Sequence, residues 1–162
     1  MTATNTTPPL KDLGQVPWPE IQDTTGSAAG IPALLTTVAR GDADTAETAL
    51  GQLRRRICRY GFVVDQATAA TVPFLWELVR LPQVTCRVEI LRLLKSIADT
   101  RQWETTAAAY PKLLRHPDNH LAWERQARHA VRAQRGLLQD LLRERDTEIV
   151  EAGRELAATL KD

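Results

Sequence analysis

The chain has few of the side chains that carry most enzyme chemistry. Its 162 residues include two cysteines, Cys58 and Cys86, which lack the CxxC spacing of a zinc or redox motif. The serines are Ser27 and Ser96, and Ser96 falls in a helical segment without a nucleophile elbow. The segment GSAAG at 26–30 lacks the Lys-Ser/Thr of a phosphate-binding loop. We therefore expect no catalytic residue, no metal site and no cofactor.

The chain also lacks a long apolar segment and an excess of charge of either sign. No apolar run approaches the roughly 20 residues that span a bilayer. The N-terminal MTATNTTPPLKDLG lacks the apolar core of a signal peptide. The formal net charge is +1, so the chain as a whole does not attract nucleic acid or an anionic membrane. These absences predict a cytoplasmic protein that keeps its cysteines reduced and binds no membrane.

Strand signals are scarce, whereas helical periodicity covers most of the chain. Aromatic residues make up 5%, and there is no Asn-Gly or Asp-Gly hairpin signal. Three segments share an apolar residue, a proline and leucines at helical spacing: IPALLTTVARGD, VPFLWELVRLPQ and YPKLLRHPDN. Because proline is tolerated in the first helical turn, Pro32, Pro73 and Pro111 are each expected to begin a helix. Asp65 is expected to cap a separate turn before Pro73.

The remaining helical segments each carry one apolar stripe. Asp44 and Glu47 are predicted as the N-cap and capping box of one helix, and Asp146 as the N-cap of the last. A further helix is expected from about 119 to 134. The stripes consist of Ala46, Ala49, Leu50, Leu53 and Ile57; of Val84, Val88, Leu91, Leu94 and Ile97; and of Ile149, Ala152, Leu156 and Leu160.

The helix pairs recur about every 40 residues, which is the period of HEAT and armadillo arrays. We therefore predict an all-α fold, a short right-handed α-solenoid of three to four HEAT-like helical hairpins. Residues 16–162 are expected to form this single domain, and residues 1–15 a disordered tail. Trp18 and Ile21 are expected to cap the first hairpin, because a terminal repeat leaves its apolar end bare.

A set of residues spread over the chain also resembles a known family, the bacterial HEAT-like repeat proteins common in actinomycetes. That resemblance implies a repeat fold, usually without an assigned activity, and the binding of other macromolecules. Most of the matching positions are packing positions. They are Trp18, Gly26, Ile31 to Leu35, Gly41, Asp42, Ala49, Leu50, Gly61, Val64, Ala67 to Ala70, Val72 to Leu75, Trp123, Gln126, Ala127, Ala130 and Val131.

Arginines and one tryptophan are the candidate partner-binding residues. Arg55 and Arg59 would share one face of a helix, and Arg87 and Arg92 lie on the corresponding helix of the next unit, so that stacking could align them as a basic stripe. Trp76 with Arg80 forms a second candidate patch, because tryptophan and arginine are enriched at interface hot spots. The alternatives are a solvated arginine face and a Trp76 that packs against the next hairpin.

Weaker patterns leave some chemistry open. A DNA glycosylase of the HEAT-like kind would need a carboxylate among aromatic residues, for which Asp118 near Trp123 and Glu104 beside Trp103 are the candidates. His116 and His120 have the spacing of metal ligands, but Pro117 between them favours a capping turn. Cys58 follows three arginines, which would lower its pKa if it were exposed; its place beside Ile57 favours a buried structural thiol.

These observations favour a non-enzymatic protein-binding module whose concave face, built by the second helix of each pair, receives another protein. A toxin-immunity protein is one specific version, which rests on family-level association. The alternative is an accessory or catalytic protein of a biosynthetic or nucleic-acid-modifying pathway that uses the solenoid groove as its pocket. Nucleic acid is the less favoured partner, and the sequence does not predict the oligomeric state.

Overall fold

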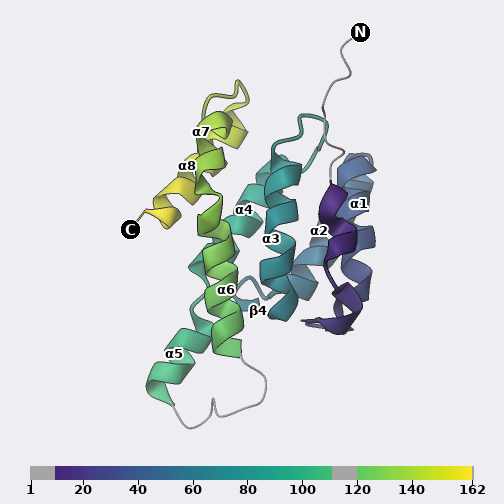
Figure 1. Ribbon diagram of the computed structural model, residues 1–162. Coiled ribbons are helices and arrows are strands. Elements are labelled where there is room, and N and C mark those ends of the chain that lie inside the picture. The colour runs from purple at the N-terminus through teal and green to yellow at the C-terminus, as the bar shows by residue number, and fades with distance from the viewer. Residues whose placement is uncertain (1–9, 111–119, 162) are drawn as a thin grey trace.

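The computed structural model describes residues 10–110 and 120–161, and within these ranges the chain is mainly helical (Figure 1). The prediction of an all-α class is confirmed. None of the described helices has both the length and the apolar character needed to cross a membrane. The α-helices are α1 (Ile31–Arg40), α2 (Ala43–Ile57), α3 (Gln66–Val79), α4 (Arg87–Asp99), α5 (Gln102–Ala109), α6 (His120–Ala133), α7 (Leu138–Leu141) and α8 (Thr147–Leu160).

Short elements connect these helices. The 3-10 helices η1 (Lys11–Gln15), η2 (Trp18–Glu20) and η3 (Ala28–Gly30) precede α1, and η5 (Arg135–Leu137) precedes α7. Two small antiparallel hairpins pair β1 (Gln22–Asp23) with β2 (Gly26–Ser27), and β3 (Cys58–Arg59) with β4 (Val63–Val64). The sequence signals did not predict either hairpin.

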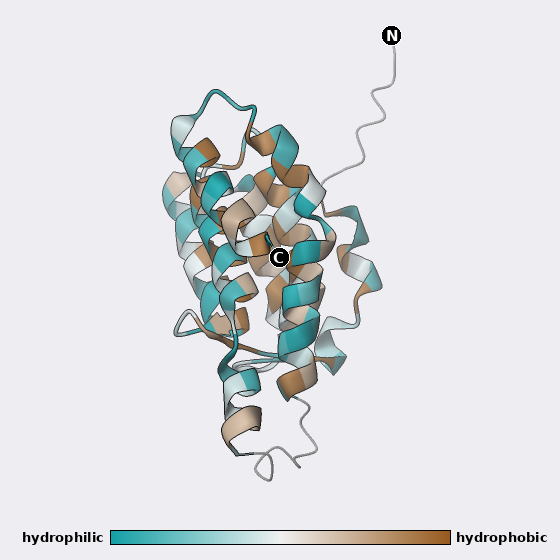
Figure 2. Cartoon of the chain, turned by 90° about the vertical axis from the view of Figure 1, so that its left-hand side faces the viewer, coloured by the Kyte–Doolittle hydropathy of each residue, from teal (hydrophilic) through white to brown (hydrophobic). Residues whose placement is uncertain are grey.

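The helices pack in two layers, with α3 and α4 in the middle. Helix α1 packs on α2, α3 packs on both α4 and α6, and α4 packs on α6 and α8. In Figure 1, α1, α3 and α6 lie in front of α2 and α4. Figure 2 shows the apolar residues, in brown, concentrated between the helices and the polar residues on the outside. The layers place α2 and α4 on the same side of the molecule.

Most of the predicted apolar stripes face this core. All five stripe residues of α2 are buried, as are all four of α8, and in the α4 segment only Val88 is partly exposed. The Asp146 cap is confirmed, because Asp146 accepts hydrogen bonds at the start of α8. Asp65 is also a cap, but it forms a capping box with Thr68 at the start of α3 and not at a separate turn as predicted. The predicted Asp44 cap is wrong, because extended backbone at Gly41 and Asp42 lets Asp42, two residues earlier, accept from Thr45 N–H.

The prediction that Pro73 begins a helix is wrong, because α3 runs without interruption from Gln66 to Val79 with Pro73 inside it. Pro73 and Ala69, the residue whose carbonyl loses its helical donor, both lie on the partly exposed side of α3. Burial of the other side of α3 holds the helix together despite the missing hydrogen bond. Pro32 does lie in the first turn of α1, as predicted, whereas Pro111 lies outside the described residues.

The N-terminal segment packs on α3, although residues 10–15 were predicted to belong to the disordered tail. Leu10 is buried and its N–H donates to the Glu77 carboxylate, so residues 10–15 belong to the packed structure. Trp18 is buried as expected, with its ring centroid 6.0 Å from that of Phe74. Residues 1–9, the rest of the predicted tail, lie outside the described range.

Replacement of Pro73 by alanine tests this account of α3. An N–H at position 73 can bond the Ala69 carbonyl, so we expect Pro73→Ala to raise the free energy of unfolding by about 1 kcal/mol or more. Urea denaturation followed by circular dichroism measures the change. A clear loss of stability would mean that the packing of α3 requires the ring of Pro73, contrary to the place of this residue on the partly exposed side of the helix.

Candidate functional site

The end of α2 is fixed by hydrogen bonds to its last carbonyls. The Arg56 carbonyl accepts from Thr24 N–H at 2.9 Å and from the Thr24 hydroxyl at 3.0 Å. The Ile57 carbonyl accepts from the buried Thr68 hydroxyl at 2.6 Å. Arg56 also forms an ion pair with the buried Asp23 at 3.0 Å. Carbonyls that a helix end leaves unbonded are thereby satisfied, and the direction of the chain after Ile57 is set.

The β3–β4 hairpin follows this junction and presents an exposed tip, residues 59–62, which we call the hairpin tip. Tyr60 and Gly61 both have positive φ, 58° and 82°. The Tyr60 side chain is 73% exposed and that of Phe62 46% exposed, with their ring centroids 6.2 Å apart. The Arg59 guanidinium lies 4.9 Å from the centroid of the Tyr60 ring. A left-handed backbone is unfavourable for tyrosine, and burial of the ring does not offset it.

A cavity of about 590 Å³ lies beside the hairpin tip, between α2 and α4; we call it the arginine pocket. Arg54, Arg55 and Arg92 are exposed on its wall. Within residues 10–110 and 120–161, none of the three takes part in an ion pair. Glu89 is the one carboxylate in a lining that comprises Gly51, Arg54, Arg55, Cys58, Tyr60, Gly61, Glu89, Arg92, Leu93 and Ser96. The pocket therefore carries an excess of positive charge.

Cys58 forms part of the pocket wall but is not a reactive thiol. Burial raises the pKa of Cys58 to about 12, and the opposing effect of nearby Arg54 is smaller. A thiol must ionise to act as a nucleophile. The interpretation of Cys58 as a buried structural cysteine is confirmed.

Gly51 occupies the middle of α2, where the pocket opens. A glycine inside a helix costs roughly 0.5–1 kcal/mol relative to alanine. A Cβ built on Gly51 has no neighbouring heavy atom within 4 Å, so packing within the chain does not require glycine here. By contrast, a Cβ on Gly41 would lie 2.7 Å from the Thr37 carbonyl oxygen. Glycine is needed for the fold at position 41 and not at position 51.

The structure brings some of the predicted partner-binding residues together and separates others. Arg55 and Arg92 line the same pocket, on adjacent helices. Arg59 lies in β3 and not on a helical face with Arg55, because α2 ends at Ile57. Arg80 is exposed at the end of α3. Arg54 and Tyr60 are not among the contact residues that the sequence predicts; the sequence signal at Tyr60 is its place before Gly61 in a turn.

Two of the predicted contact residues are wrong because they are buried. Trp76 is 0% exposed, on the core side of α3, so it forms no surface patch with Arg80. Arg87 is 7% exposed; its Nε donates to the Val79 carbonyl at 2.7 Å and its guanidinium pairs with Glu144. Arg87 therefore ties the start of α4 to the end of α3 and to the segment before α8.

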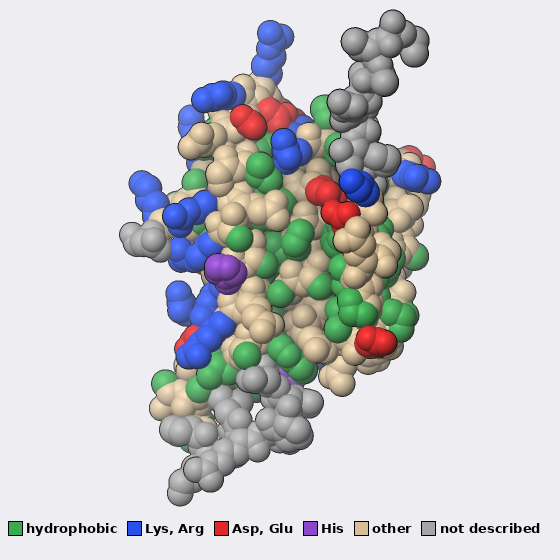
Figure 3. Space-filling model, in the orientation of Figure 1, with side chains coloured by type: hydrophobic (Ala, Val, Ile, Leu, Met, Phe, Trp, Pro, Cys, Tyr) green, Lys and Arg blue, Asp and Glu red, His purple; other side chains and the backbone are tan. Residues whose placement is uncertain are grey.

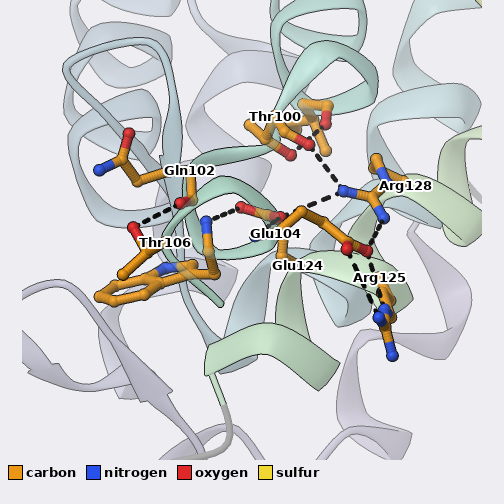
Figure 4. A network of polar contacts seen from close by, with 9 residues as sticks. Thr100, Gln102, Glu104, Thr106, Glu124, Arg125 and Arg128 are labelled. Carbon is orange, nitrogen blue, oxygen red and sulfur yellow. Dashed lines mark hydrogen bonds and ion pairs between the residues drawn. The ribbon is translucent and has the colours of Figure 1, made fainter. Parts of the chain in front are cut away.

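A second polar cluster joins α5 to α6 (Figure 4). The fully buried Glu124 accepts from the N–H groups of Trp103 and Glu104 at 2.9 and 3.0 Å, which caps the start of α5. Arg128 donates to Glu124, to Glu104 and to the Thr100 carbonyl. Hydrogen bonds from Arg125 and Arg128 lower the pKa of Glu104 to about 2. Glu104 is therefore held as an anion, and the cluster joins the two helices.

Aromatic rings lie near this cluster. The Trp103 and His120 rings are stacked with centroids 4.5 Å apart, and His120 meets Trp123 edge-on at 4.9 Å. The other two candidates of this region, His116 and Asp118, lie outside the described residues. Among the described residues, no group of three histidines, cysteines or carboxylates is arranged to hold a metal ion.

A wider groove of about 890 Å³ lies between the end of α6, α7 and the end of α8. His129, Arg132, Arg135 and Lys161 line it together with apolar residues such as Leu142. In Figure 3, Lys and Arg side chains gather along the left-hand edge, over these C-terminal helices. Arg132 donates to the Leu160 carbonyl, so this arginine already serves to hold the end of α8.

Comparison of the chain with protein-family models, with curated proteins and with solved structures found no match.

The two glycines of α1–α2 give opposite predictions for stability. We expect Gly51→Ala to raise the free energy of unfolding by roughly 0.5–1 kcal/mol, and Gly41→Ala to lower it by about 1–3 kcal/mol through the clash with Thr37. Chemical denaturation of both variants beside the wild type measures the two changes. A destabilised Gly51→Ala variant would show that the fold itself requires the glycine.

The Glu104 ion pairs predict a pH dependence of stability. Because its folded pKa lies below the ordinary value of 4.5, their contribution is fully present above about pH 4.5 and is lost as the pH falls towards 2. Glu104→Gln should therefore be less stable than the wild type at neutral pH, and the difference should vanish near pH 2. Chemical denaturation of both proteins at several pH values across this range measures the difference in their free energies of unfolding. Glu151→Gln, which removes an exposed glutamate without an ion pair among the described residues, is the control and should change little at neutral pH.

Proposed function

We propose that this protein is a non-enzymatic protein-binding module that receives an acidic segment of another protein in the arginine pocket. In this proposal Arg54, Arg55 and Arg92 contact carboxylates of the partner. Tyr60 provides the aromatic anchor at the rim. Arginine and tyrosine, together with tryptophan, are enriched among the interface residues that contribute most of the binding energy.

Tyr60 is the observation that carries this proposal. Its left-handed backbone disfavours a residue with a Cβ, and its ring stays 73% exposed, so the fold gains little in return. Asparagine or glycine would serve the turn better. A local cost of this kind is understandable if the ring contacts a partner. The neighbouring arginines, which have no ion pair among the described residues, indicate the charge of that partner.

We also propose a short right-handed HEAT-like solenoid as the finer fold, and the packing of successive helix pairs supports the stacking in this proposal. The helix pair α1–α2 is followed by the pair α3–α4. Helix α3 packs in turn on α6, and α4 packs on α8. In such a stack the second helices of successive pairs line one face. The arginine pocket lies between α2 and α4, which is the face that we propose as concave.

Nucleic acid is the second candidate, because the arginines of the pocket would also suit phosphates. Against it stand the net charge of +1 and Glu89 within the pocket. Fluorescence anisotropy with labelled DNA and RNA separates the two. A nucleic-acid ligand predicts affinity that falls steeply with salt, whereas our proposal predicts negligible binding at physiological salt.

Affinity capture from a cell extract treated with nuclease tests the protein-binding proposal. We expect one dominant protein on the immobilised wild type and its loss with Arg54→Glu/Arg92→Glu, because the reversed charges repel an acidic segment. Tyr60→Asn should also lose it while keeping or gaining stability, since asparagine tolerates the left-handed backbone.

The matched control is Arg80→Glu, an exposed arginine outside the pocket, which should retain the partner. Equal capture by the wild type and the double variant would contradict the proposal. A circular dichroism melt of each variant excludes unfolding as the cause of lost capture.

A further inference from the structure

The exposed face of α2 reverses its charge at its middle. Asp44 and Glu47 lie on the first half of the helix, and Arg54 and Arg55 on the second half. All four side chains are exposed, and none forms an ion pair with another of the described residues. Gly51 separates the two halves. This order complements the helix dipole, but the dipole gives no reason for a glycine between the halves.

The surface around Gly51 is hollowed on both sides. The arginine pocket adjoins it towards α4, and a second cavity of about 500 Å³ is lined by Asp44, Glu47, Thr48, Gly51, Gln52 and Arg55. With no Cβ at position 51 and nothing near the space it would occupy, another backbone can approach α2 closely at this point.

The charges are placed symmetrically about this point. Glu47 precedes Gly51 by four residues and Arg55 follows it by four, which is about 6 Å along the helix axis in each direction. If a second α2 crosses antiparallel at Gly51, Glu47 of each copy meets Arg55 of the other. A parallel crossing would bring like charges together. Such a face is self-complementary, as the interface of a two-fold symmetric dimer must be.

We propose that the occupant of the α2 face is a second copy of this chain, bound antiparallel across a two-fold axis at Gly51. The proposal stands independently of the arginine pocket's partner. Because Gly51 and Arg55 belong both to this face and to the pocket, the second copy competes with the acidic partner for that rim. Arg92 lies on α4 and belongs to the pocket alone.

Sedimentation equilibrium of charge-reversed variants tests the pairing. The wild type should form a dimer that dissociates as salt rises, since exposed ion pairs are screened. Glu47→Arg and Arg55→Glu each turn two attractions into two repulsions and should weaken dimerisation by about tenfold or more. The double variant Glu47→Arg/Arg55→Glu should restore the dimer. An equal mixture of the two single variants should form a heterodimer, although neither pairs with itself.

Two further variants separate the dimer from other effects. Gly51→Gln should weaken dimerisation by occupying the crossing point, while improving helix propensity and so the stability of the monomer. Arg92→Glu should leave the dimer unchanged and weaken capture of the acidic partner. Circular dichroism of the single variants, beside the restored double variant, shows that they remain folded.

The outcomes are decisive in each direction. A wild type that stays monomeric up to its solubility limit in low salt overturns the inference, as does a dimer that the single reversals do not change or the double reversal does not restore. A monomeric protein that still loses its partner with Arg54→Glu/Arg92→Glu would overturn the dimer and leave the proposed function standing. A dimer that captures no partner even after Glu47→Arg has dissociated it, with all three pocket arginines in place, would overturn the proposed function and leave the dimer standing.

Discussion

The junction where α2 meets α3 determines most of what this surface can do. Thr68 accepts from Asp65 N–H and donates to the Ile57 carbonyl, so one hydroxyl begins α3 and ends α2. The hydrogen bonds of Thr24 to Arg56 add the N-terminal segment to the same point. Because these groups are buried or partly buried, leaving one unbonded would be costly. The hairpin tip therefore leaves the core in a fixed direction, beside the arginines of α2.

The unusual residues of this surface contribute little to folding. Gly51 weakens a helix without relieving a contact, and Tyr60 occupies a backbone conformation suited to other residues. The three arginines of the pocket lie near one another without partners among the described residues. Natural proteins depart from local preferences mainly where function requires it. Elsewhere in the described chain, the arginines Arg56, Arg87 and Arg128 are tied into ion pairs that hold elements together.

The predictions that are correct depend mainly on local geometry, and those that are wrong depend mainly on tertiary packing. The stripes of α2 and α8 were predictable because periodicity reports directly which side of a helix can leave water. Asp65 and Asp146 were predictable because capping needs only local geometry. Pro73 was misread because the local rule against proline in a helix was weaker than the burial of α3 on its other side. Trp76 and Arg87 were misplaced because a surface arginine or tryptophan and a buried one have the same local sequence.

Local sequence is enough to predict the helical class, the inward faces of the helices and a basic segment at the end of α2, because these depend on neighbours three and four residues apart. Only the packing of the helices shows which arginines form ion pairs among the described residues, such as Arg56, Arg87 and Arg128. It also decided that Arg92 lies across a pocket from Arg55, and that Gly51 faces open space. The reason is that each of these properties depends on residues far apart along the chain, whose positions are set by the packing of α3 and α4.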